Sequence, residues 1–529
     1  MVEFYSEKEF ETWSENLHEQ GDDLKRWNIK YYKGLGTSTS AEFRDYFVKM
    51  SNHIQQFKVT GEPCFKAIDD AFSADEVEIR RQFILNYDHS DQFDETPDEI
   101  KVNDFIHYQL GNYFMHSATR ALPNIMDGLK DVQRKILWVC LNRQNKEIKV
   151  AQLAGAVAEK ANYHHGETSI QNAIVHMARD IVGTSPQNNI NLLEPIGQFG
   201  SRLEGGKDSA AARYIFTKLS PVTKSIYMSS DDQLYSYTTD DGTQREPDYY
   251  APIIPMLLIN GAYGIGVGFR TNIPAHCPVS VIESIQALVE EREPKELTPW
   301  YRGFKGDIQM TEKNSFTSYG RFRKVKETNT VVHFNIDELP LGVWTQDYLK
   351  KLQKWKADEL IKSFDDYSSD VKVNIDVRLA NDKNVTDVLR LSKSNKYRNS
   401  MVGLNHYGRV KVYKSTQEIL SDYFVVRAQL YEKRFSGLTA EKKAKSAFTI
   451  NQLRFIEEKK KLNIESRTKN EVVNILRTAK FESNPVNQEL MSDHNFKTLE
   501  IVLFAEHPKR TMNLTTYSIC HFIIKPLKK

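Results

Sequence analysis

Residues 415–463 contain no proline and a single glycine, Gly437, and this stretch constrains the fold more than any other. Proline breaks helices and glycine weakens them, so their near absence over this length predicts one long helix. Apolar residues are spaced for a packed face at its start and again near its end: Tyr423, Val426, Leu430, Leu453 and Ile456. The middle is polar all round, which is typical of an exposed strut, and no second long helix follows to pack beside it.

The composition is that of a globular protein: the 529 residues are 40% apolar and 27% charged, which predicts two to four domains. The 72 basic and 70 acidic residues nearly cancel, so any nucleic-acid surface must come from sorting charge within the fold. Four cysteines without a CxxC pair fit a reducing compartment and exclude a cysteine-rich zinc site. The sequence shows no signal peptide and no membrane span, which predicts an intracellular protein with no membrane partner.

Patterning divides the rest of the chain into segments. Helical patterns and a glycine-rich turn fill 1–83, and an acidic, turn-rich stretch follows at 86–100. Between 102 and 222, short amphipathic pieces such as "RKILWVCLNR" and "KVAQLAGAVAEKA" are typical of a helix-turn-helix or winged-helix module. Between 225 and 410, "TVVHFNI" and "VKVNIDVRL" predict strands. The expected fold class is therefore multidomain, with α/β and α+β parts.

Individual motifs leave two interpretations open. In "ANYHHGETS", His165 is either a structural histidine or a phosphate ligand beside Gly166, and the spacing is wrong for a metal site. In "GAYGIGVG", Ile265 is either buried or an apolar wedge that enters a DNA base step. The basic residues of "RALPNIMDGLKDVQRKIL" form either a solvated face or a phosphate grip. "KGLGTSTS" is a flexible turn with an exposed Lys33 or a backbone–phosphate contact.

Five stretches occurring in order decide between these interpretations. They are "YYKGLGTSTS", "DGLKDVQRKIL", "VAQLAGAVAEKANYHHGETS", "LLEPIGQFGSRLEGGKDSAAARYIF" and "PIIPMLLINGAYGIGVG". Together they closely resemble type IIA DNA topoisomerases, and their sequences are nearest to those of the eukaryotic and large-DNA-virus branch. The resemblance extends from about residue 3 to 485.

The resemblance implies a catalytic tyrosine in "GGKDSAAARYIFTKLS". Tyr214 would attack a DNA phosphodiester and leave a 5′-phosphotyrosyl link on each strand of a double-strand break, through which a second duplex passes. Arg213 would stabilise charge on the phosphoryl group, Arg120 would lie near the same phosphate, and His165 beside the reacting centre.

The resemblance also implies a DNA-binding set. Asp127, Lys130 and Arg134 fall on a motif that positions the DNA backbone. Ile265 would intercalate and bend the duplex, and Lys33 would lie near DNA. Double-stranded DNA and a second copy of the chain, forming a homodimer, are the expected partners.

The implied domains follow the segments of the chain. They are 1–90, the end of a Toprim domain; 91–101, an acidic linker; 102–222, a winged-helix domain; 223–412, a tower domain with strands; and 413–529, an incomplete coiled-coil exit gate.

The cofactors implied by the resemblance are Mg²⁺, through Toprim acidic residues, and ATP, through an ATPase domain; both sets of residues are absent from the sequence. No metal ligand is expected on this chain, which we predict to be inactive alone. It would be a fragment, a truncated product or a split subunit with a separate ATPase/Toprim chain. The expected location is the nucleus, or a cytoplasmic viral replication site.

Two alternatives remain at this stage. A catalytically incompetent DNA-binding and bending fragment would never become covalently attached to DNA. A break-making relative of meiotic recombination initiators would lack the "GAYGIGVG" tower and the gate helix.

Overall fold

The protein is described by a computed structural model that covers most of the chain. The described residues are 2–4, 7–19, 26–27, 29–30, 38–87, 99–240, 243–312, 315–380, 385–396, 400–462 and 467–481. Contacts divide the chain into two compact units, Met1–Arg427 and Ala428–Lys529. The first unit mixes helices with several small sheets, so the expected multidomain α/β class is confirmed.

The N-terminal part is mainly helical, with α1 (Glu7–Glu19), α2 (Ser40–Val48), α3 (Glu62–Phe72) and α4 (Val77–Leu85). A capping box begins α2, where Thr39 and Glu42 bond each other's backbone N–H groups. Strand β1 (Gln56–Lys58) pairs in parallel with β2 (Glu99–Lys101). The described end of the expected acidic linker is therefore a strand, and its Ile100 is buried.

Short helices fill the region from 102 to 222 as expected. They include α6 (Gly111–Ala121), α7 (Asp131–Leu141), α8 (Val150–Lys160) and α9 (Glu167–Ala178). The last three pack on one another through fully buried side chains, among them Ile136, Leu153 and Ile174. A small antiparallel sheet with the order β3 (Ile148–Lys149), β5 (Phe216–Leu219), β4 (Leu193–Ile196) completes the arrangement.

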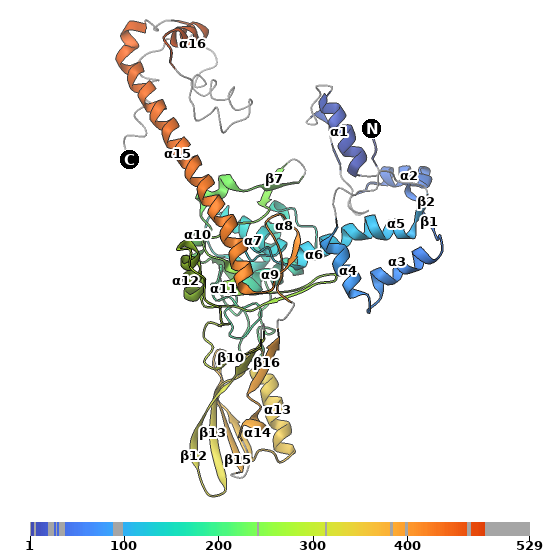
Figure 1. Cartoon of the computed structure of the whole chain (residues 1–529), viewed down its shortest axis with the longest axis vertical. Coiled ribbons are helices and arrows are strands. Elements are labelled where there is room, and N and C mark those ends of the chain that lie inside the picture. Colours follow the sequence, from blue (N-terminus) through green and yellow to red (C-terminus); the bar gives the residue numbers. More distant parts are fainter. Residues whose placement is uncertain are drawn as a thin grey trace. The chain divides into compact units, whose positions relative to one another are not determined.

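Strands dominate the next part of the chain (Figure 1). One antiparallel sheet has the order β12 (Arg321–Glu327), β13 (Val331–Glu338), β15 (Ile375–Ala380), β14 (Ser363–Asp366). Its core is shared with α13 (Thr345–Ala357), whose Tyr348 and Leu352 are buried. A second sheet has the order β10 (Asp307–Glu312), β11 (Ser315–Tyr319), β16 (Ser392–Lys396). "TVVHFNI" forms β13 as expected, whereas the strand within "VKVNIDVRL" begins only at Ile375.

The glycine-rich segment forms a hairpin of β8 (Ala262–Ile265) and β9 (Arg270–Ile273). It follows the buried helix α11 (Met256–Asn260) and precedes α12 (Pro278–Val289). The remaining elements of this unit include the hairpins β6 (Tyr237–Asp240)–β7 (Thr243–Pro247) and β17 (Val402–Leu404)–β18 (Val410–Val412).

The predicted long helix is present as α15 (Thr416–Leu462). Its expected first packed face is confirmed, since Tyr423, Val426 and Leu430 are all buried. The second packed face is wrong, since Leu453 is 57% exposed and Ile456 is 52% exposed. A shorter helix, α16 (Lys469–Thr478), lies further along the chain. None of the described helices is both long and apolar enough to span a membrane.

Candidate functional site

Tyr214 lies on a short anchored loop and faces solvent. Its side chain is 66% exposed, although its neighbour Ile215 is buried. The loop is bonded to the start of α8, where the Val150 N–H donates to the Ile215 carbonyl at 3.0 Å and the Ala151 N–H donates to Ala212 at 3.1 Å. These bonds hold the tyrosine at the N-terminal end of α8, where a large substrate can reach it.

Arg213 lies beside this tyrosine. Its guanidinium carbon is 5.0 Å from the centroid of the Tyr214 ring, and both side chains are exposed. A cation at this distance can stabilise negative charge on a group that is bonded to the phenolic oxygen. A tyrosine hydroxyl group and a cation therefore lie side by side on an exposed loop.

A second pair joins Arg120, in the last turn of α6, with His165, in the turn between α8 and α9. Partial burial, followed by the positive charge of Arg120, lowers the pKa of His165, and Asp131 acts in the opposite direction. The ring of buried Tyr163 meets the His165 ring edge-on, with centroids 5.2 Å apart. The lowered pKa favours the neutral form of His165, in which the imidazole can accept a proton.

The two pairs lie at opposite ends of α8. The Tyr214 loop is bonded to the first turn of this helix, whereas Tyr163 bonds its last turn through the Ala158 carbonyl. A helix of 11 residues is about 16 Å long. The four side chains expected around one phosphate therefore form two half-sites within one chain.

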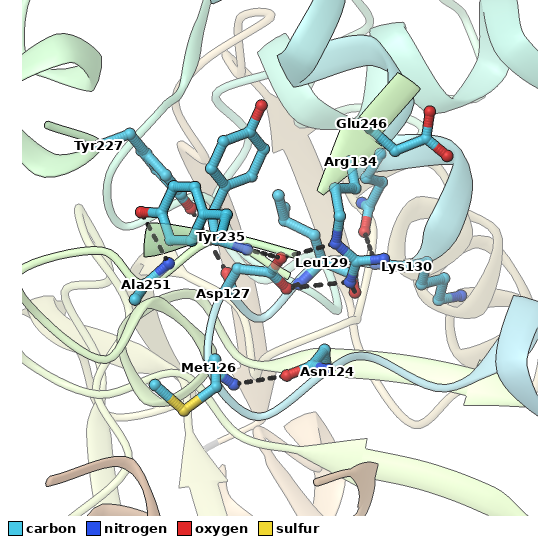
Figure 2. A network of polar contacts seen from close by, with 12 residues as sticks. Asn124, Met126, Asp127, Leu129, Lys130, Arg134, Tyr227, Tyr235, Glu246 and Ala251 are labelled. Atoms are coloured by element: carbon cyan, nitrogen blue, oxygen red, sulfur yellow. Dashed lines mark hydrogen bonds and ion pairs between the residues drawn. The ribbon is translucent and has the colours of Figure 1, made fainter. Parts of the chain in front are cut away.

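Asp127 and Arg134 lie in the interior (Figure 2). The Asp127 side chain is 0% exposed, and its Oδ2 accepts from Arg134 Nε at 2.7 Å. Asp127 also accepts from the backbone N–H groups of Leu129 and Tyr250, at 2.9 and 3.0 Å. Direct contact with DNA, expected for this pair, does not fit such burial. The pair instead fixes the turn between α6 and α7.

Lys130 lies beside the end of α6, close to Gly264, which precedes Ile265 in the hairpin. A Cβ atom at Gly264 would lie 2.1 Å from the Ala121 carbonyl oxygen and 3.3 Å from Lys130 Nζ, so only glycine allows this close approach. Burial lowers the pKa of Lys130. The neighbouring Ile265 is 67% exposed, so the interpretation of a buried residue is wrong.

Two further residues, His176 and Arg179, which the sequence did not single out, lie near this group. Partial burial, then the charges of Arg179 and Lys130, lower the pKa of His176 to about 4. Arg179 follows α9, and its buried Nε has no hydrogen-bond partner among the described residues. Arg179 is the C-cap residue of α9, and its positive charge acts on His176.

The structure does not test the expected DNA contact of Lys33. Lys33 lies outside the described residues. Within the described ranges, no group of three or more His, Cys, Asp or Glu side chains could hold a metal ion. These residues do not fit a Mg²⁺ site, and we assign no step of the reaction to a metal held by them.

Comparison with known proteins gives two family matches. The family of the A subunits of DNA gyrase and topoisomerase IV matches residues 120–519. The family described as "C-terminal associated domain of TOPRIM" matches residues 1–118.

Similar proteins cover nearly the whole chain. DNA topoisomerase 2-alpha of Cricetulus griseus is 38% identical over 511 residues, which are 91% of this chain and 33% of that protein. DNA topoisomerase 2 top-2 of Caenorhabditis elegans is 38% identical over 515 residues, 92% of this chain and 33% of that protein. This chain therefore spans about one third of the length of these relatives.

A solved structure is also similar. The crystal structure of the Plasmodium falciparum topoisomerase II DNA-binding, cleavage and re-ligation domain superposes with a TM-score of 0.83 and 33% identity. The match covers 99% of this chain and 73% of that one.

Proposed function

Because the chain belongs to the family of DNA gyrase and topoisomerase IV A subunits, which are type IIA DNA topoisomerases, we propose that it is the breakage-reunion portion of such an enzyme. The observation that carries this proposal is the exposed Tyr214, held beside Arg213 on an anchored loop. The substrate is duplex DNA, and the overall reaction is an isomerisation that changes DNA topology by passing a second duplex through the break.

In the proposed reaction the phenolic oxygen of Tyr214 bonds to a DNA phosphorus, and the bond from that phosphorus to the 3′ oxygen breaks. The phenol loses a proton and the 3′ oxygen gains one, so the products are a 5′-phosphotyrosyl ester and a 3′ hydroxyl. Resealing is the reverse step and needs no external energy. Arg213 stabilises charge on the phosphoryl group, and the neutral His165 of a second chain can accept the phenolic proton.

The half-sites support a homodimer. The Tyr214 loop and the Arg120–His165 pair are attached to opposite ends of α8, so two copies facing each other would complete both sites. Each site would then combine the tyrosine of one chain with the cations of the other. One tyrosine per strand also agrees with a break in both strands.

The remaining assignments are proposed from the family. Mg²⁺ would bind the acidic residues of a Toprim domain, and ATP would drive duplex passage in an ATPase domain, on the same polypeptide or a separate one. The domains 1–90, 91–101, 102–222, 223–412 and 413–529 and the DNA contact of Lys33 stay predictions. The location would be the nucleus or a cytoplasmic viral replication site.

An adduct assay tests the proposal. The chain is incubated with labelled duplex DNA, Mg²⁺ and a separately supplied Toprim–ATPase fragment, and denaturant traps covalent complexes. We expect an adduct that disappears in Tyr214→Phe. Salt-sensitive binding without any adduct would contradict the proposal and favour a DNA-bending fragment.

A further inference from the structure

One face of the β8–β9 hairpin is open to solvent and carries the exposed Ile265. The register pairs Ile265 with Arg270 and Tyr263 with Asn272, so these four side chains share that face. The opposite face is buried against the protein through Ala262, Thr271 and Ile273. Ile265, the side chain proposed as a wedge, therefore lies next to polar side chains on the same face of the hairpin.

This open face ends in a cavity of about 260 Å³. Tyr263, Arg270 and Asn272 line one wall, Lys393 and Asn395 of β16 line another, and Ser185 contributes a hydroxyl group. The lining contains two cations and no aspartate or glutamate. The two cations, together with lining amides and hydroxyl groups, make this composition suited to an anion.

The two cations are held in place. Lys393 Nζ donates to the Gly342 carbonyl at 3.2 Å. Burial, and then the charge of Lys351, lowers the pKa of Lys393. The Arg270 guanidinium carbon lies 5.5 Å from the centroid of the Tyr263 ring. Arg270 and Lys393 are both exposed and line the same cavity, whose lining offers them no counter-charge, so a bound anion would interact favourably with both.

We propose that this cavity holds a backbone phosphate of the bent DNA on the far side of the Ile265 wedge, an inference that rests on the proposed function. Tyr263 precedes Ile265 by two residues, about 7 Å along a strand. That distance equals the axial rise of about two base-pair steps, at about 3.4 Å per step. The cavity admits a single phosphate and its sugar, and is too small for a duplex.

The test combines a salt titration of DNA binding with a measurement of bending by end-to-end energy transfer. The double variant Arg270→Gln/Lys393→Gln should lower the slope of log affinity against log salt by about 1 and leave the duplex less bent. The single variant Arg270→Lys keeps the positive charge, so its slope should stay close to that of the wild type. Lys356→Gln, an exposed lysine at the end of α13, is the matched control and should behave like the wild type.

The outcomes separate the two proposals. A double variant that melts like the wild type, with unchanged slope and bending, would overturn the phosphate site and leave the topoisomerase proposal standing. Wild-type chain that does not bind DNA would contradict both. Calorimetric titration with inorganic phosphate distinguishes a DNA phosphate from a free anion. If the double variant no longer binds inorganic phosphate but keeps the wild-type salt slope for DNA, the cavity binds a free anion and the inference is overturned.

Discussion

Gly264 is a residue at which the fold tolerates little change. In Gly264→Ala the new Cβ would meet the Ala121 carbonyl oxygen at 2.1 Å, so the hairpin must shift away from α6. Overpacking of this kind costs about 1–3 kcal/mol of the free energy of unfolding, which urea denaturation measures. The matched control is Gly437→Ala on α15, where nothing lies within 4 Å of the new atom. That variant should gain about 0.5–1 kcal/mol. Equal effects of the two substitutions would contradict the close approach.

Asp127 and Arg134 lead to a second prediction. Asp127→Asn leaves the buried guanidinium without its counter-charge, which should destabilise the fold by about 3–5 kcal/mol. Asp337→Asn is the control, because its partner Arg321 is 51% exposed, and such a pair contributes about 1 kcal/mol or less. A loss in Asp127→Asn no larger than in the control would show that this pair does not fix the turn.

His176 should give the fold a pH dependence. Its folded-state pKa of about 4 lies below the ordinary value of 6.5, so between these values the unfolded chain binds the proton and the folded chain does not. The contribution of His176 is therefore fully present above pH 6.5 and is lost as the pH falls toward 4. Stability should rise with pH in this window, and His176→Gln should show a shallower rise. Parallel curves for the two proteins would refute this assignment.

At the scale of elements, periodicity predicts much of the fold. "KVAQLAGAVAEKA" predicts α8 and "TVVHFNI" predicts β13, because the apolar residues of each segment recur with the spacing of a single type of secondary structure. The same reasoning fails at Leu453 and Ile456, since an apolar spacing says nothing about whether a partner surface exists.

Charged residues show a different limit. In "DGLKDVQRKIL" the sequence does not distinguish Asp127 and Arg134, which are buried together, from Lys130, which lies beside the hairpin. The cavity between Arg270 and Lys393 could not be predicted either, because its walls come from segments more than 100 residues apart. The quoted motifs predict the nucleophile by resemblance, whereas long-range packing decides which cations surround it.

At the scale of the whole molecule, the central claim is that each cleavage site is built from two chains. It follows from α8, which separates the Tyr214 loop from the Arg120–His165 pair by about 16 Å. Consider a mixed dimer of one Tyr214→Phe chain and one Arg120→Ala chain. If each site combines Tyr214 of one chain with Arg120 of the other, one of the two sites keeps both residues. Sites built within one chain would leave none.

The most direct measurement is therefore cleavage by such mixed dimers, purified with two different tags and supplied with the Toprim–ATPase fragment and Mg²⁺. We predict covalent attachment through Tyr214 of the Arg120→Ala chain and a nick in one strand, while each homodimer of the variants gives no more than a trace. A mixed dimer as inactive as the two homodimers, with intact DNA binding, would contradict the account.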